Sequence, residues 1–168
     1  LLKRIAPYFK FPDWVSKLAQ KSTSTTNNST KSFLQKIDLN KVTASQLQKV
    51  YGIGAYYSER ITRYRDSFEG GFISDIQLQG ISGLTSEVID NILKQFTVKS
   101  PRQVNKISLN SATIDQLVSI EFIDYELAYE IIELRMLRDG YSTLEELTKV
   151  KEFPKEKLEI IKLYLSLN

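Results

Sequence analysis

The chain has 168 residues, 42% of them hydrophobic, with no cysteine, no histidine and a net charge of +3, which is enough apolar material for one or two small cores. This composition excludes cysteine-based zinc sites, disulfides and nucleophile systems that depend on histidine. The charge runs from +5 over residues 1–32 through +1 over 33–100 to −3 over 101–168, so a strongly basic protein that coats nucleic acid is also excluded, and any such contact must be local.

The N-terminal part divides into an apolar and a polar piece. Residues 1–20 hold two short apolar-periodic segments, and Ile5-Ala6-Pro7-Tyr8-Phe9 is similar to the segment 161–165. This region is therefore either the remnant of an earlier repeat or a pair of unrelated N-terminal helices, and the sequence leaves both open. Residues 21–32 offer nothing that can be buried, which predicts a flexible linker.

No apolar run approaches the roughly 20 residues that span a bilayer, so we expect no membrane contact from this chain. The sequence begins with Leu1 rather than Met. We expect that residues before Leu1 have been removed and that any targeting segment lay there.

From Phe33 onward the chain is an internal duplication, visible when residue numbers are offset by 70 and, after one deletion, by 69. Arg65 matches Arg135, Gly70 matches Gly140 and Phe72 matches Tyr141. The pattern predicts two copies of one domain, over residues 33–100 and 101–168.

The sequence of each copy predicts four helices, and it shows little of the period-two alternation that is typical of strands. In the first copy, the capping-box pair Thr43 and Gln46 opens a helix that ends at Lys49 or Val50, and a second helix follows over 55–67. The remaining start signals are Ser74 with Gln77, Thr85 or Ser86 for a helix to about Phe96, Thr113 with Gln116, Thr143 with Glu146, and Pro154 at a first helical position.

The stretch 47–61 predicts two helices joined by a tight turn at Gly52-Ile53-Gly54. The two glycines allow positive φ and leave backbone N–H groups exposed where the second helix begins. Those N–H groups and the positive end of the helix dipole favour a phosphate. We expect Ile53 to point into the core and the small Ser58 to let the helices cross closely. A weaker hairpin at 78–85 places Gly83 where Gly52 stands and Thr85 where Gly54 stands.

This combination resembles the helix-hairpin-helix motif, and residues 39–65 are similar to the ComEA family of bacterial competence DNA receptors. The resemblance implies an all-α fold with two tandem double helix-hairpin-helix domains of the SAM-domain-like type. It also implies that hairpin amides hold double-stranded DNA by its phosphates without reading sequence, across two hairpins related by a pseudo-twofold. A role in DNA uptake, in the cell envelope, periplasm or outside the cell, follows from it. A monovalent cation on the first hairpin's carbonyls is left open, and no other cofactor is expected.

The backbone N–H groups assigned to phosphate are those of Gly54, Tyr56 and Tyr57, with Thr85 and Ser86 at the weaker hairpin. Relatives often carry Lys or Arg where this chain has Tyr56 and Tyr57, although a tyrosine hydroxyl also donates to phosphate. The nearby cations, Lys99 included, are more typical of solvated helix-surface charges than of DNA contacts. The complete candidate DNA-binding set is Lys49, Gly52, Ile53, Gly54, Tyr56, Tyr57, Arg60, Arg63, Gly83, Thr85, Ser86 and Lys94.

The second copy departs from this pattern, since Phe122-Ile123-Asp124 replaces the Gly-Ile-Gly turn. Asp124 is expected to satisfy the helix N-terminal amides with its own carboxylate, and Glu121 and Glu126 to add repulsion of phosphate. We therefore expect the second copy to be structural or to contact a protein partner.

No catalytic cluster is evident, and no enzyme activity is expected. Glu126, Glu130 and Glu133 with Arg135 and Arg138 have the spacing of an ion-paired helix surface. Tyr51, Tyr56, Tyr57 and Tyr64 are more typical of core and rim positions than of a base-stacking platform. Two alternatives to DNA binding remain: a protein-interaction scaffold that keeps the fold without DNA, and an accessory region of a nuclease whose catalytic segment precedes Leu1.

Overall fold

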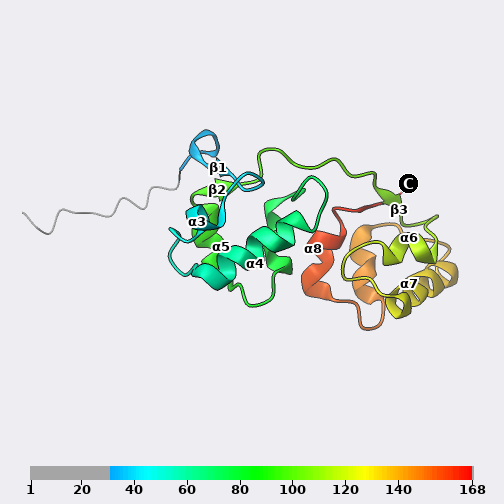
Figure 1. Ribbon diagram of the computed structural model, residues 1–168. Coiled ribbons are helices and arrows are strands. Elements are labelled where there is room, and N and C mark those ends of the chain that lie inside the picture. Colours follow the sequence, from blue (N-terminus) through cyan, green and yellow to red (C-terminus); the bar gives the residue numbers. More distant parts are fainter. Residues whose placement is uncertain (1–30, 168) are drawn as a thin grey trace, which may run out of the picture. The chain divides into compact units, whose positions relative to one another are not determined.

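The computed structural model describes residues 31–167 (Figure 1). The predicted repeat remnant at 1–20 and almost all of the predicted linker at 21–32 lie outside the described residues. Ser32 already takes part in the fold, because its backbone N–H donates to Oε1 of Gln35 at 3.1 Å.

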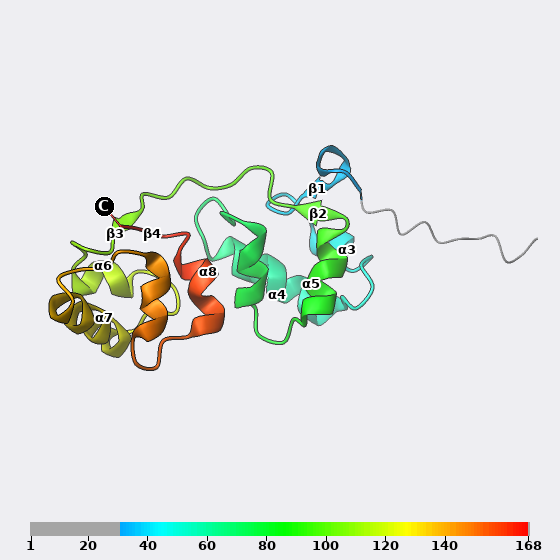
Figure 2. The same ribbon diagram turned by 180° about the vertical axis from the view of Figure 1, so that it is seen from behind.

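The first copy folds from helices and one pair of short strands, and both views show α3, α4 and α5 gathered beside that pair (Figures 1 and 2). Ile37 pairs in parallel with Phe96, so the two ends of the copy are tied together. Its elements are the 3₁₀ turn η2 (Phe33–Gln35), β1 (Ile37–Asp38), α3 (Ala44–Leu47), α4 (Ala55–Asp66), the 3₁₀ helix η3 (Asp75–Gly80), α5 (Ser86–Leu93) and β2 (Phe96–Thr97).

The second copy repeats this order. Ile107 pairs in parallel with Leu165, as Ile37 does with Phe96. Its elements are β3 (Ile107–Ser108), α6 (Ile114–Val118), α7 (Tyr125–Leu137), the 3₁₀ helices η4 (Leu144–Lys149) and η5 (Lys155–Lys157), α8 (Leu158–Ile161) and β4 (Leu165–Ser166).

The predicted capping boxes are confirmed. Thr43, Ser74, Thr113 and Thr143 each precede a helix and exchange hydrogen bonds with the Gln or Glu three residues later. These four pairs satisfy backbone N–H groups that would otherwise lack partners at a helix start. The helix starts are therefore encoded locally in the sequence.

The mainly helical fold is confirmed, but several predicted details are wrong. A purely α fold does not allow for the two strand pairs, and α5 ends at Leu93 rather than near Phe96 because Phe96 and Thr97 pair with β1. The third helix of each copy is a 3₁₀ helix.

Two predicted helix boundaries also differ. The first helix, α3, ends at Leu47, before Lys49 and Val50, because the following turn closes with tighter bonds such as Val50 N–H to Leu47 O. Pro154 lies at the N-cap of η5, not at its first position.

One asparagine side chain braces each copy. The Asn40 amide donates to the Phe72 carbonyl at 2.9 Å and accepts from the Phe72 N–H at 2.8 Å. Asn110 does the same with Tyr141 at 3.0 and 2.8 Å. The glycine against each brace is Gly71 in the first copy and Gly140 in the second. Gly71, rather than Gly70, is therefore the counterpart of Gly140.

Each copy has its own apolar core, built from corresponding residues. The first includes Leu39, Leu47, Ile61, Phe72, Leu78, Ile92 and Phe96. The second includes Leu109, Leu117, Ile131, Tyr141, Leu147, Ile161 and Leu165. The duplication read from the sequence is thus a duplication of the packed interior.

Polar contacts join the two copies. The Tyr64 hydroxyl donates to both carboxylate oxygens of Glu121, at 2.7 and 2.6 Å. Gln77 donates to the Tyr164 hydroxyl at 3.2 Å, and Arg102 donates to the same oxygen at 3.1 Å. Burial raises the pKa of Glu121, and burial together with the bond to Glu121 raises the pKa of Tyr64. The copies therefore pack on each other through specific hydrogen bonds.

In residues 31–167, none of the helices combines the length and the apolar character that crossing a membrane requires.

Candidate nucleic-acid interface

The first hairpin leaves the N-terminus of α4 open. Gly52 has φ +89°, a left-handed conformation that favours glycine, and Ile53 is buried as predicted. Gly54 is the N-cap of α4 and supplies no side chain to the N–H groups that follow. Within residues 31–167, no partner is found for the backbone N–H groups of Gly54, Tyr56 and Tyr57. With no acidic residue in its first turn, the α4 N-terminus can accept an anion.

Two reciprocal contacts relate the hairpins of the first copy. A Cβ built on Gly52 would lie 3.0 Å from Cγ2 of Val88, and one built on Gly83 would lie 3.2 Å from the Tyr57 hydroxyl. Adding 31 to each residue number carries Gly52 onto Gly83 and Tyr57 onto Val88. Each turn therefore packs on the helix that follows the other turn, which is the arrangement of a local pseudo-twofold.

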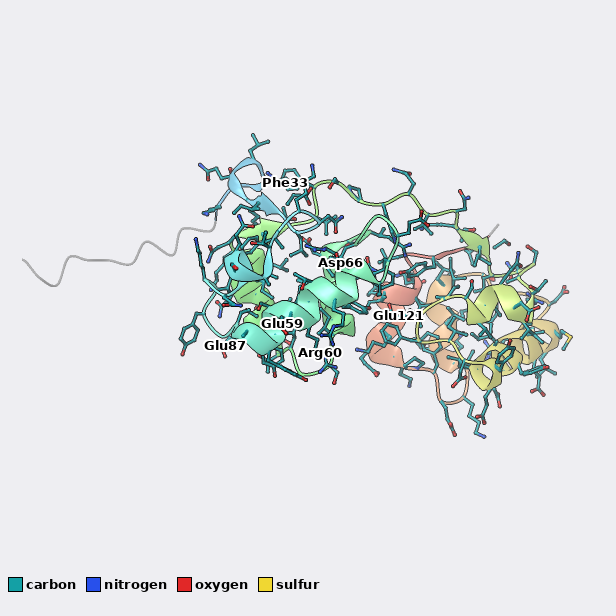
Figure 3. The ribbon with its side chains drawn as sticks, viewed as in Figure 1. Phe33, Glu59, Arg60, Asp66, Glu87 and Glu121 are labelled. Carbon is teal, nitrogen blue, oxygen red and sulfur yellow. The ribbon has the colours of Figure 1, made fainter. Side chains whose placement is uncertain are left out.

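The second hairpin is less open than the first. Oγ1 of Thr85 accepts from the Val88 N–H at 3.4 Å, so this cap supplies an intramolecular partner. Glu87 is exposed in the first turn of α5, near the N-terminal end of α4 (Figure 3). Its carboxylate disfavours an anion beside the Thr85 and Ser86 amides. Sequence reasoning missed Glu87, although it follows Tyr56 by the same 31 residues that separate the turns.

The candidate cations have different surroundings. Arg60 donates to the Tyr56 hydroxyl at 2.8 Å, which holds both side chains on one face of α4. Lys94 donates to Oδ1 of Asn91 at 2.8 Å, and Lys99 to the Leu34 carbonyl at 3.0 Å. Among the residues that the structure describes, Lys49 and Arg63 are exposed and have no hydrogen-bond or ion-pair partner.

A groove of about 440 Å³ runs along α4 from the hairpin, lined by Tyr56, Arg60, Arg63 and Tyr64 among others. The tyrosines near it divide into two kinds. Tyr51 is 84% exposed and Tyr56 65% exposed, so neither is a core residue. Tyr57 and Tyr64 are half-buried and pack against the core. The open amides of α4 thus lie at the end of a groove whose charged residues are Arg60, Arg63 and Glu59.

The second copy has closed the corresponding site, as the sequence predicts. Oδ1 of Asp124 accepts from the Leu127 N–H at 2.9 Å. Leu127 corresponds to Tyr57, so the carboxylate is bonded to the counterpart of an amide that stays open in the first copy. Glu126, the counterpart of Tyr56, adds an exposed acidic side chain to the same turn.

Two expectations about the second copy's charges are wrong. Glu121 does not lie free at the hairpin, because its half-buried carboxylate accepts from Tyr64. The acids of α7 do not form an ion-paired surface with Arg135 and Arg138. Arg135 instead donates to the carbonyls of Leu109 and Ala112, as Arg65 does to those of Leu39 and Val42, and Arg138 pairs with Glu146.

No group of three or more histidines, cysteines or acids in the described residues is placed to hold a metal ion. The monovalent cation at the first hairpin stays a prediction, because it would be held by backbone carbonyls.

The repeated hairpins and the open helix N-terminus define a tandem helix-hairpin-helix protein of the DNA-binding type. The chain belongs to the helix-hairpin-helix motif family, whose model matches residues 33–97 and 102–166. This match does not single out the ComEA branch.

A curated relative is the endonuclease/exonuclease/phosphatase family domain-containing protein 1 of Danio rerio. It is 25% identical over 145 residues, covering 76% of this chain and 26% of the relative. The chain therefore spans about a quarter of that relative's length. No solved structure matches the chain.

Proposed function

We propose that the first domain binds double-stranded DNA without sequence preference, by holding a backbone phosphate on the amides of Gly54, Tyr56 and Tyr57. The observation that carries this proposal is the N-terminus of α4, which has neither a side-chain cap nor an acid in its first turn. The equivalent turns at α5 and α7 have both a side-chain cap and an acid. The first hairpin is therefore the principal site, and Thr85 and Ser86 give weaker support.

The groove along α4 supports the same proposal. Arg63 is free to meet a second phosphate, and Arg60 is held by Tyr56 at the hairpin end. Contacts limited to phosphates bind weakly, with dissociation constants on the order of 10⁻⁴ to 10⁻⁶ M at physiological salt. In this proposal the chain binds DNA and does not cleave it.

The test is a fluorescence-anisotropy titration of a short duplex of random sequence, at about 50 and 200 mM salt. Gly54→Asp copies the second domain's own residue and closes the site with a carboxylate. Gln103→Glu adds one negative charge at an exposed connecting residue and serves as the matched control. We expect the wild type and Gln103→Glu to bind alike and Gly54→Asp to fold but lose binding. Equal binding by all three proteins, or by none at low salt, overturns the proposal.

We propose two settings for this binding. The first setting is DNA uptake, which is suggested by the resemblance to competence receptors. The second is that of a DNA-binding region accompanying a nuclease domain, which is suggested by the relative in Danio rerio, whose name includes an endonuclease/exonuclease/phosphatase domain. Loss of labelled-DNA uptake in cells that lack the gene supports the first. Nuclease activity of the protein in its full natural length supports the second.

A further inference from the structure

The exposed face of α7 differs from the same face of α4 in its charge and in its apolar side chains. Because the two helices are related by an offset of 70, each position can be compared directly. Arg60 and Arg63 of α4 correspond to Glu130 and Glu133 of α7. Asp66 and Ser67 at the end of α4 correspond to Met136 and Leu137. The first domain thus has a polar surface of mixed charge, with Glu59 and Asp66 beside the two arginines, where the second has an acidic and apolar one.

The apolar part of this face is well exposed. Tyr125 is 58% exposed, Tyr129 60%, Met136 71% and Leu137 76%. They are the large hydrophobic residues exposed in the range 101–167, and all four lie on α7. Tyr125, Tyr129 and Met136 follow helical spacing along one side. Clustered apolar exposure of this kind marks an interaction surface more often than scattered single residues do.

The acids beside this stripe have no partners of their own. In the part of the chain that the structure describes, Glu126, Glu130 and Glu133 take part in no ion pair. The ion pairs of the second copy involve Glu145, Glu146 and Glu159 instead. The surface therefore has uncompensated negative charge next to exposed apolar side chains.

A groove follows α7 beside this stripe, and Leu137 is the exposed apolar residue that lines it. One pocket of about 210 Å³ is lined by Phe122, Leu127 and Pro154 with Glu126 and Glu152 among its acids. A second, of about 220 Å³, is lined by Leu134, Leu137 and Val150 with Glu133. Both pockets include Glu130 and Lys151, so they meet. The groove has apolar walls and a mainly acidic rim, over a helix about 20 Å long.

We propose that this groove and the exposed face of α7 dock an amphipathic helix of a partner protein, with lysine or arginine beside its apolar stripe. The binding mode is a helix laid in a groove, with apolar anchors and complementary charges at the rim. The unpaired carboxylates exclude a nucleic-acid backbone from the same surface. They also disfavour a symmetric dimer, because a twofold contact would place acid against acid.

The partner surface lies on the copy whose anion site is closed, and the proposed DNA site lies on the other copy. The two proposals rest on different residues. The docking proposal therefore stands or falls independently of DNA binding.

The probe is a labelled synthetic helical peptide of leucine and lysine with an apolar stripe at three- and four-residue spacing. A peptide of the same pattern with glutamate for lysine, and a scrambled leucine-lysine peptide, are the controls. Binding is measured by anisotropy, and the site is mapped from amide chemical shifts of the whole chain. We expect the leucine-lysine peptide to bind at least tenfold more tightly than either control, with shifts concentrated in α7 and residues 149–154.

Two pairs of substitutions copy residues that the first domain already carries at the same positions: Met136→Asp with Leu137→Ser, and Glu130→Arg with Glu133→Arg. Each pair is expected to weaken peptide binding tenfold or more. Asp115→Arg with Glu156→Arg changes the charge equally at exposed positions away from the groove and should leave binding unchanged.

Equal binding of the glutamate peptide, or full binding by both pairs of variants, overturns the proposal. So does a dimer in sedimentation velocity that Leu137→Ser dissociates, since a second copy of the chain is then the occupant.

Discussion

Tyr64 and Glu121 join the helix of the candidate DNA site to the closed hairpin of the second domain, with the hydroxyl 2.6 Å from Oε2 of the carboxylate. Burial raises the pKa of Glu121, against smaller lowering effects of Tyr64, Lys157 and Arg102. A carboxyl whose pKa is raised by folding stabilises the fold fully below its unfolded value of about 4.3. That contribution is lost as the pH rises through the folded value.

Glu121→Gln should therefore gain stability relative to the wild type as the pH rises. The glutamine keeps an oxygen for the Tyr64 hydroxyl but cannot ionise. We expect the free energy of urea unfolding of the wild type, minus that of the variant, to fall between about pH 4 and pH 7. Tyr64→Phe removes the donor and should destabilise the wild-type background by about 1–3 kcal/mol. A difference between wild type and Glu121→Gln that does not change with pH contradicts this account.

Gly52→Ala and Gly54→Ala should separate the roles of the two glycines in the first turn. Gly52 has φ +89°, and an added Cβ would lie 3.0 Å from Val88, whereas a Cβ on Gly54 meets nothing within 4 Å. Gly52→Ala should lose about 1–2 kcal/mol of stability from the left-handed backbone alone. Gly54→Ala should stay within about 0.5 kcal/mol of the wild type, the usual range for a surface change. Thermal and urea unfolding measure both, and equal losses would show that the turn does not depend on Gly52.

Asn40→Ala should be among the more damaging polar substitutions. It leaves the Phe72 N–H and carbonyl without the side-chain partners that they have at 2.8 and 2.9 Å. We expect a loss of about 1–3 kcal/mol in urea unfolding, because the Phe72 N–H is left without a partner, whereas its carbonyl still accepts from the Arg102 N–H at 3.2 Å. Asn110→Ala tests the same brace in the second copy. Asn105→Ala, at an exposed connecting residue, should change stability little, and a comparable loss there would show that Asn40 has no special role.

Glu146 should titrate at an unusually low pH. Its pKa is lowered to about 2, first by the hydrogen bond from Lys149 and then by the Ser142 and Thr143 backbone N–H groups. A lowered folded value means that the capping box is intact above the unfolded value of about 4.3 and is lost as the pH falls toward about 2. Amide shifts of Ser142 and Thr143, followed by NMR from pH 5 to about 1.5, should report this midpoint. Lys149→Ala should raise it, and an ordinary glutamate midpoint in the wild type contradicts the assignment.

Much of the helical organisation can be read from the sequence because its signals are local. A capping box such as Thr43 with Gln46 lies within four residues, so it can be recognised without knowing the rest of the fold. Strands β1 and β2 leave no such signal, because two residues are too few for a period and their partners lie 59 positions apart, as with Ile37 and Phe96. The distinction between α and 3₁₀ in residues 75–80 likewise depends on packing.

The candidate site was predictable in part. The open turn at Gly52 to Gly54 follows from residue type, and the cap of Asp124 follows from the same reasoning. The ion pairs expected along α7 do not form, because Arg135 is drawn to the carbonyls of Leu109 and Ala112. Those carbonyls lie more than 20 residues away in the chain, beyond the reach of helical spacing rules.

Phe122 and Glu152 have φ values of +68° and +57°, at the two turns where the first domain has Gly52 and Gly83. A turn can therefore keep its backbone path after its glycine has been replaced. A search for hairpins by glycine spacing would pass over both turns of the second domain. A search by shape would find both, although the Asp124 carboxylate caps the helix that follows the first of them. The number of hairpins in this chain is accordingly not the number of open helix N-termini, and the residue that caps each helix tells the two apart.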